Sequence, residues 1–198
     1  MPFELWGDSE IELRWFKGLN PRLAKCKSNL ISGRKKNPKH IENLVFYDRP
    51  DIVLCNGDQP ILVLEKTREV PTGHNIPQRF GRIARALECN VPALLVTPFR
   101  ARKHGKYSGI CQLNSRVLRA AIRMGKIHSL PCLFFEWKSN DDGELVGDGS
   151  DCFGLRRTIN HLIENPISAP SNIIKTIIDN MSLAAALTES RSCLLYTS

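Results

Sequence analysis

The sequence lacks long apolar runs and paired cysteines, and both absences restrict what the protein can be. Its longest apolar runs, such as LVLE and VPALLV, fall far short of the roughly 20 residues that span a bilayer. Its seven cysteines are scattered singly without a CxxC pair, and the hydrophilic start MPFELWGDSEIELR does not look like a secretory leader. We therefore expect a cytoplasmic protein with reduced thiols and no membrane partner.

The signatures of several common enzyme classes are missing as well. Neither GxGxxG nor GxSxG occurs, and HGKYSG lacks the upstream glycine of a phosphate-binding loop. The five histidines are too dispersed to argue for a zinc site. These absences argue against dinucleotide-dependent enzymes, nucleotide triphosphatases, serine hydrolases and zinc proteins.

What the sequence does have is positive charge and enough apolar residues for a core. Its 28 Lys plus Arg outnumber 20 Asp plus Glu, which gives a net charge of +8 and a field that favours polyanions. With 198 residues, 42% of them hydrophobic, the chain is most simply one domain over residues 1–192. The final CLLYTS, residues 193–198, resembles a translated sequencing adapter, so we expect the native sequence to be cut off near Arg191.

The periodicity of apolar residues predicts an α/β fold. Ser9 and Glu12 form the S-x-x-E pattern of a helix start, and residues 77–89 carry apolar side chains at helical spacing. The apolar run 91–97 follows as a buried strand, which suggests a parallel crossover onto the sheet. Further elements are expected as a helix over 114–128, a strand over 130–137 and a helix over 172–181, whereas the cationic stretch 20–43 is expected to be a loop.

Residues 49–69, RPDIVLCNGDQPILVLEKTRE, predict a hairpin that carries an acid on each strand. The strands are expected at roughly 44–55 and 61–68, and a turn centred on Asp58 places Asp51 opposite Glu65. Directly opposed side chains have Cβ atoms about 4.5 to 5.5 Å apart, which lets two carboxylates bind one divalent cation. A register slip of one residue puts the two acids on opposite faces instead.

At this point the sequence resembles the PD-(D/E)xK phosphodiesterase superfamily, which includes type II restriction endonucleases. The resemblance rests on Pro50, Asp51, Glu65 and Lys66 and covers about residues 8–99, with a third hairpin strand possible over 44–48. It implies a restriction-endonuclease-like fold, with a mixed central sheet flanked by helices. It also implies hydrolysis of DNA with Mg²⁺, or Mn²⁺, bound by Asp51 and Glu65.

One position departs from the family pattern, which has its lysine two places after the second acid. Thr67 stands there, and side-chain alternation directs Lys66 to the opposite face. Three explanations are open. A bulge could turn Lys66 toward the metal, Thr67 could act together with Lys17 or His74, or the site could be inactive.

Other residues are candidates for supporting roles. Gln78 is expected beside the metal site, whereas the capping-box role of Glu12 explains that residue, and Glu10 is an equal candidate for an additional acid. Contacts to the nucleic-acid backbone are expected from cationic residues in three segments, because such contacts supply most of the affinity for nucleic acids. These residues are Arg34, Lys35, Lys36, Arg79, Arg82, Arg100, Arg102, Lys103 and Lys106.

The sequence therefore predicts a metal-dependent DNA endonuclease. Asp51 and Glu65 are the expected metal ligands, and Lys66 or Thr67 is expected to orient the attacking water. The alternative is a catalytically inactive nucleic-acid-binding module of the same fold, and an RNA substrate is a third possibility. Restriction endonucleases are often dimers, so a homodimer is possible, but no dimer interface can be identified from the sequence.

Overall fold

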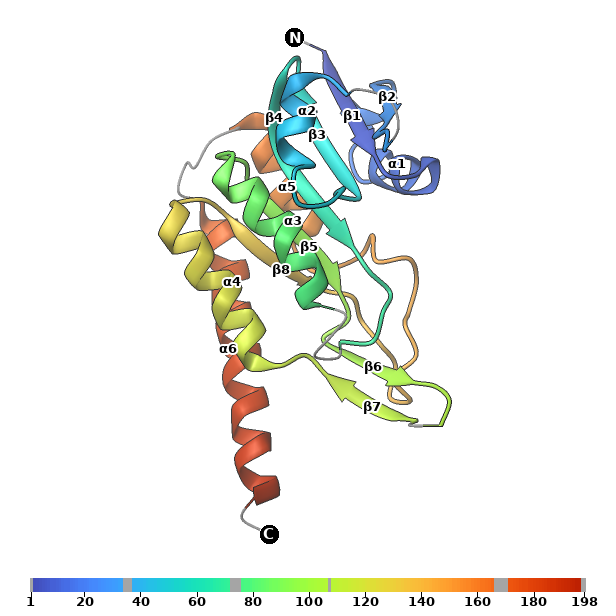
Figure 1. Cartoon of the computed structure of the whole chain (residues 1–198). Helices are drawn as coiled ribbons and strands as arrows, with labels where there is room; N and C mark the ends of the chain where they lie inside the picture. The colour runs from blue at the N-terminus through green and yellow to red at the C-terminus, as the bar shows by residue number, and fades with distance from the viewer. Residues whose placement is uncertain (1, 34–36, 72–75, 107, 166–170, 197–198) are drawn as a thin grey trace.

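A computed structural model describes residues 2–33, 37–71, 76–106, 108–165 and 171–196. Six strands form a mixed central sheet with helices packed against it (Figure 1), so the predicted α/β class is confirmed. In sheet order the strands are β2 (Lys27–Leu30), β1 (Phe3–Gly7), β3 (Ile52–Asn56), β4 (Gln59–Lys66), β5 (Ala93–Thr97) and β8 (Cys132–Glu136). Strands β1, β3 and β4 are antiparallel neighbours, whereas β4, β5 and β8 run parallel.

The β3–β4 hairpin contains a bulge that determines which side chains face each other. Its turn has only two residues, Gly57 and Asp58, and Gly57 has φ 60, a left-handed conformation that suits glycine. The pairing begins as Asn56 with Gln59, but the register shifts between Leu54 and Cys55 and then continues to Ile52 with Leu64. Extending that register by one residue puts Asp51 opposite Glu65, as the sequence predicts.

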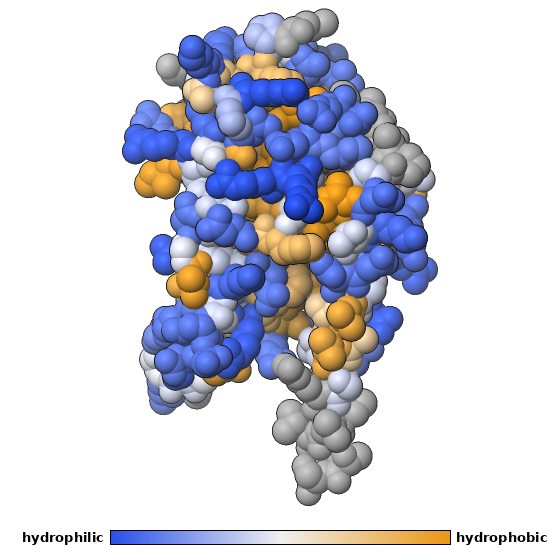
Figure 2. Space-filling view, turned by 180° about the vertical axis from the view of Figure 1, so that it is seen from behind, coloured by the Kyte–Doolittle hydropathy of each residue, from blue (hydrophilic) through white to orange (hydrophobic). Residues whose placement is uncertain are grey.

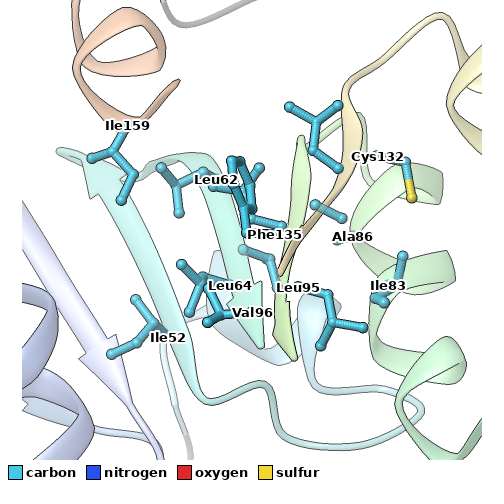
Figure 3. Packing of buried hydrophobic residues seen from close by; sticks show 14 of the residues in the cluster. Ile52, Leu62, Leu64, Ile83, Ala86, Leu95, Val96, Cys132, Phe135 and Ile159 are labelled. Carbon is cyan, nitrogen blue, oxygen red and sulfur yellow. The ribbon is translucent and has the colours of Figure 1, made fainter. Parts of the chain in front are cut away.

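Two groups of helices cover the two faces of the sheet. On one face, α3 (Pro77–Glu88) packs against β4 and β5, with α2 (Lys39–Leu44) beside it. On the other face lie α5 (Leu155–Glu164) and α1 (Glu10–Lys17), and Arg156 of α5 donates a hydrogen bond to the carbonyl of Gly18 at the end of α1. Figure 3 shows the two halves of the core, with Ile83 and Ala86 of α3 on one side and Ile159 of α5 on the other.

The segment from α3 to β5 has the helix and the buried strand that its apolar spacing predicts. Ile83, Ala86 and Leu87 of α3 are buried, and all five residues of β5 are buried because helices cover both faces of the sheet there. The helix α4 (Ser115–His128) then leads to β8, which pairs in parallel with β5. The long helix α6 (Asn172–Tyr196) packs against α4 and β8, and its far end extends below the sheet in Figure 1.

Several elements differ from the expectations. The possible third strand over 44–48 is wrong, because α2 occupies 39–44 and a turn follows it. The first hairpin strand begins at Ile52 rather than near residue 44. The stretch 20–43, expected as a loop, contains β2, most of α2 and the short helix η1 (Pro21–Leu23), and neither β1 nor α5 was predicted. Part of the expected basic loop is a two-stranded ribbon of β6 (Arg100–Lys103) and β7 (Gly109–Gln112), which lies apart from the central sheet.

The surface is mainly hydrophilic. Figure 2 shows the side turned away from the viewer of Figure 1, where hydrophobic residues form separate patches between polar ones. Among the residues that the structure describes, none of the helices is both long and apolar enough to span a membrane.

Candidate metal site

Asp51 and Glu65 come together at the open end of the β3–β4 hairpin. Asp51 directly precedes β3, and Glu65 is the penultimate residue of β4. The Asp51 backbone N–H donates to Glu65 Oε1 at 3.0 Å, and Asp51 Oδ2 accepts from the Lys66 backbone N–H at 2.7 Å. Each acid is therefore tied to the backbone of the opposite strand, and both positions are set by the hairpin register.

Burial makes it costly for these two acids to be ionised. The Glu65 side chain is fully buried, and this burial, together with the charge of Asp51, raises the pKa of Glu65 to about 8. Burial also raises the pKa of Asp51, and the charge of Glu12 adds to that effect. Two acids that are desolvated side by side require a cation close by if both are to be ionised.

Arg82 of α3 supplies that cation in this structure. Its Nη1 lies 2.8 Å from Glu65 Oε2 and 3.4 Å from Asp51 Oδ1. Its Nε and Nη2 lie 2.7 and 2.6 Å from Oδ2 of Asp48, a more exposed acid three residues before Asp51. The neighbour of Arg82, Ile83, is buried against the sheet, and this packing of α3 brings Arg82 to the acids. The guanidinium therefore occupies the space between the two carboxylates.

The donor set fits a hard divalent cation. Mg²⁺ and Mn²⁺ prefer carboxylate oxygens, and Mg²⁺ usually takes only one or two carboxylates from the protein and completes its shell with water and substrate oxygens. The Arg82 guanidinium already shows that one cationic group can contact Asp51 and Glu65 together. Within the described ranges, no group of three or more His, Cys, Asp or Glu side chains is arranged to bind a metal. A metal here would therefore depend on the two acids.

Lys66 lies on the other face, as alternation along the strand predicts. Its ammonium is 3.6 Å from Glu12 Oε2 and 4.4 Å from the centroid of the Trp15 ring, and both partners belong to α1. It also lies 5.4 Å from the centroid of Trp137. The bulge explanation is wrong for this structure, because the bulge lies near Cys55 and the pairing of Glu65 and Lys66 with β5 is regular.

The two residues proposed as replacements for the lysine are not brought to the acids. Lys17 Nζ donates to the Cys26 carbonyl at 2.8 Å, near the far end of α1, and His74 lies outside the described residues. Alternation places Thr67 on the Glu65 face, where it is 3% exposed and its hydroxyl accepts a hydrogen bond from the Glu69 backbone N–H.

Gln78 is exposed in the first turn of α3, four residues before Arg82. The two residues therefore share one side of the helix.

The side chain of Glu12 forms an ion pair that the capping-box interpretation did not predict. Ser9 accepts from the Glu12 backbone N–H as predicted, but the Glu12 carboxylate pairs with Lys66.

Among the predicted nucleic-acid contacts that the structure describes, the four arginines all have partners within the protein. Arg79 Nη1 lies 3.1 Å from Glu69 Oε2. On the ribbon, Arg100 donates to the carbonyls of Asn140 and Asp141, and Arg102 donates to the carbonyl of Asp142. These two arginines therefore bind the ribbon to the acidic loop that follows β8. Lys103 is half-buried and Lys106 exposed, whereas positions 34–36 lie outside the described residues.

Sequence reasoning missed Arg68 and Asp48. Arg68 is exposed two residues after Lys66, and its guanidinium lies 5.7 Å from the Trp137 ring centroid. It lines a pocket with Arg102 and His104 of the ribbon segment. Arg68 could have been identified from its position in the charged run EKTRE at the strand end. Nothing in the sequence identifies Asp48, because its role depends on where α3 packs.

No family model, curated protein or solved structure matches this chain. The site therefore has to be interpreted from its own geometry and charge.

Proposed function

We propose that this protein is a divalent-metal-dependent nuclease of restriction-endonuclease-like architecture, which hydrolyses DNA phosphodiesters at Asp51 and Glu65. The observation that carries the proposal is the pair of desolvated carboxylates from opposite strands with a cationic group between them. The antiparallel β1–β3–β4 strands, followed by α3 and the parallel β5, agree with the fold implied by the resemblance to PD-(D/E)xK enzymes.

Asp51 and Glu65 would hold the cation, with their carboxylates fixed by the backbone of the opposite strand. Bound Mg²⁺ or Mn²⁺ supplies positive charge that polarises a phosphoryl oxygen and makes water more acidic. Thr67, on the same face as Glu65, is the better candidate for orienting the attacking water, because Lys66 is engaged with Glu12 and Trp15. Arg79, whose positive charge acts to lower the pKa of Asp51 against the larger effect of burial, would hold a phosphate of the backbone close to the acids.

A cleavage assay on plasmid, linear DNA and RNA with Mg²⁺ or Mn²⁺ tests the proposal. Asp51→Asn keeps a side-chain oxygen that can accept from the Lys66 N–H but removes the charge, so we expect cleavage to fall at least about 100-fold while DNA binding persists. Asp58→Asn is the matched control, because this acid lies in the turn at the other end of the same hairpin and is 99% exposed. Equal cleavage by wild type and Asp51→Asn would contradict the assignment.

Two observations favour a second candidate function, a catalytically inactive nucleic-acid-binding module. Arg82 already lies in contact with both acids, and Lys66 faces away from them. In that case the intact protein binds nucleic acid but cuts neither DNA nor RNA with any divalent metal. Preferential cutting of RNA would keep the metal chemistry but change the substrate.

A further inference from the structure

Arg82 is the only side chain among the described residues that hydrogen-bonds both Asp51 and Glu65. A single atom, Nη1, makes both contacts, while Nε and Nη2 bind Asp48. The guanidinium thus has an inner end between the buried acids and an outer end at an acid whose side chain is 52% exposed. The two ends interact with different acids, so one can leave without the other.

We propose that Arg82 and the divalent cation compete for one position between Asp51 and Glu65, so that Arg82 blocks the site until metal displaces it. This inference rests on the proposed function, because it assumes that the acids bind metal. When metal enters, Nη1 withdraws from the two acids, and the guanidinium remains bound to Asp48 at the edge of the site.

Electrostatics requires the two cations to exclude each other. Nη1 is 2.8 Å from a Glu65 oxygen, a distance at which a metal ion bound by the same oxygens would be in close contact with the guanidinium. Like charges a few ångströms apart in a partly buried site repel strongly, because little water screens them. The Arg82 side chain is 22% exposed, so it already borders solvent and has a direction in which to move.

Asp48 makes the displacement reversible. Burial acts to raise the pKa of Asp48, but the hydrogen bonds from Arg82 and from the Arg49 backbone N–H outweigh it and lower the pKa below its ordinary value. Asp48 therefore remains an anionic partner for Arg82 near neutral pH. Without metal, the inner end of the guanidinium returns to Asp51 and Glu65, which have no other cation at hydrogen-bond distance among the described side chains.

Calorimetric titration of the full chain with MgCl₂ and MnCl₂ tests this competition without measuring cleavage. We expect Arg82→Gln to bind metal at least about tenfold more tightly than wild type, a factor that corresponds to about 1.4 kcal/mol. Arg82→Lys should lie between them, because a lysine keeps the charge but contacts fewer acids at once. The titrations are best done at about pH 8.5, because metal binding to carboxyl groups has to displace protons.

Arg85→Gln is the matched control. It removes the same charge from the same helix, but Arg85 pairs with Glu88 and the Asn43 carbonyl rather than with the two acids. We expect its metal affinity to stay within about twofold of wild type, since only a distant charge is lost. Equal or weaker metal binding by Arg82→Gln would overturn the competition and leave the proposed nuclease intact. If neither wild type nor Arg82→Gln binds metal, both the competition and the metal-dependent function fail.

A second measurement uses the wild-type fold and does not depend on the stability of the variants. The arginine side-chain ¹⁵N signals, with Arg82 assigned by comparison with Arg82→Lys, can be followed while metal is added. We expect the chemical shifts of the Arg82 Nη signals to change at metal concentrations that saturate the site. The chemical shift of the Nε signal should stay that of a group hydrogen-bonded to Asp48. Saturation by metal with unchanged Nη signals would overturn the proposal.

Discussion

Glu65 and Lys66 are consecutive residues of β4, yet they lie in two different electrostatic environments. Toward α3, Glu65 belongs to a cluster of three carboxylates that share one guanidinium. Toward α1, Lys66 pairs with the single carboxylate of Glu12 and packs against the ring of Trp15. On the α3 face three carboxylates contact one guanidinium, whereas on the α1 face the Lys66 ammonium pairs with one carboxylate and packs against an aromatic ring. The chemistry is therefore expected on the α3 face, and the α1 face is expected to be structural.

The largest effect is expected from removing the guanidinium of Arg82, which contacts both Asp51 and Glu65. Arg82→Leu leaves Glu65 buried without a cation, and breaking such a buried pair costs about 3 to 5 kcal/mol of unfolding free energy. Urea denaturation at about pH 9 measures it best, because Glu65, with its pKa of about 8, is then ionised.

Arg85→Leu on the same helix is the control, with a loss of about 1 kcal/mol expected for its more exposed pair with Glu88. If the two leucine variants lose the same stability, the acids on the α3 face do not depend on Arg82, and the contrast between the two faces is weaker than described.

The next prediction concerns pH. The pKa of Glu65 is raised from 4.5 to about 8, so the folded chain holds this proton more tightly than the unfolded chain. The stability that this group contributes is complete below pH 4.5 and is lost as the pH rises through 8. Relative to Glu65→Gln, we therefore expect wild type to lose on the order of 3 kcal/mol between about pH 5 and pH 9.

Denaturant titrations across that pH range give the comparison, and Glu88→Gln serves as the control because Glu88 is exposed and also pairs with an arginine. Its stability curve should run parallel to that of wild type. A Glu65→Gln curve that also runs parallel to wild type would show that Glu65 carries no raised pKa.

The acid pair was predictable from the sequence, although not for the right reason. The sequence prediction centred the turn on Asp58, and symmetric pairing of the two strands about that residue put Asp51 opposite Glu65. The structure has a tighter two-residue turn, which by itself would put Asp51 opposite Leu64, and the bulge shifts the register back by one. A bulge in an apolar stretch such as PILVL leaves no mark in the sequence.

The direction of Lys66 was predictable because alternation along a strand is a local property. Its partners Glu12 and Trp137 were not, because they come from distant segments that only the folded chain brings together. Arg82 was predicted as a contact to the nucleic-acid backbone and not as a partner of the acids, because its acidic partners depend on how α3 lies over the hairpin. The short segments KSNL of β2 and KHIENL of α2 were missed because four to six mostly polar residues carry too little periodicity.

Smaller effects are expected on the α1 face. Lys66→Met keeps an unbranched side chain beside the Trp15 ring and leaves Glu12 with 24% of its side chain exposed. We expect a loss of about 1 kcal/mol in unfolding free energy, the scale of a partly exposed ion pair with a cation–π contact.

The same variant should keep cleavage within about threefold of wild type, whereas Thr67→Val, on the Glu65 face, should lower cleavage by about tenfold or more. The matched assay is single-turnover cleavage with saturating Mg²⁺. A loss of about 100-fold in Lys66→Met would place a catalytic group on the α1 face and reverse the comparison.

The smallest predicted effect is on how the proposed DNA binding depends on salt, and it concerns Arg68, which follows β4 and, like Lys66, lies near Trp137. The Arg68 guanidinium lies 5.7 Å from the Trp137 ring centroid and lines the pocket beside the β6–β7 ribbon, and we expect it to contact one phosphate there. Loss of one phosphate contact lowers the slope of log K against log salt concentration by about 0.9. Binding of a non-cleaved duplex in Ca²⁺, measured at several salt concentrations, should show this decrease in Arg68→Gln. It should not appear in Arg119→Gln, which removes an arginine of α4 that is paired with Glu189 of α6. Since both variants lose one positive charge, a decrease of the same size in both would mean that DNA binding responds to net charge rather than to a contact with Arg68.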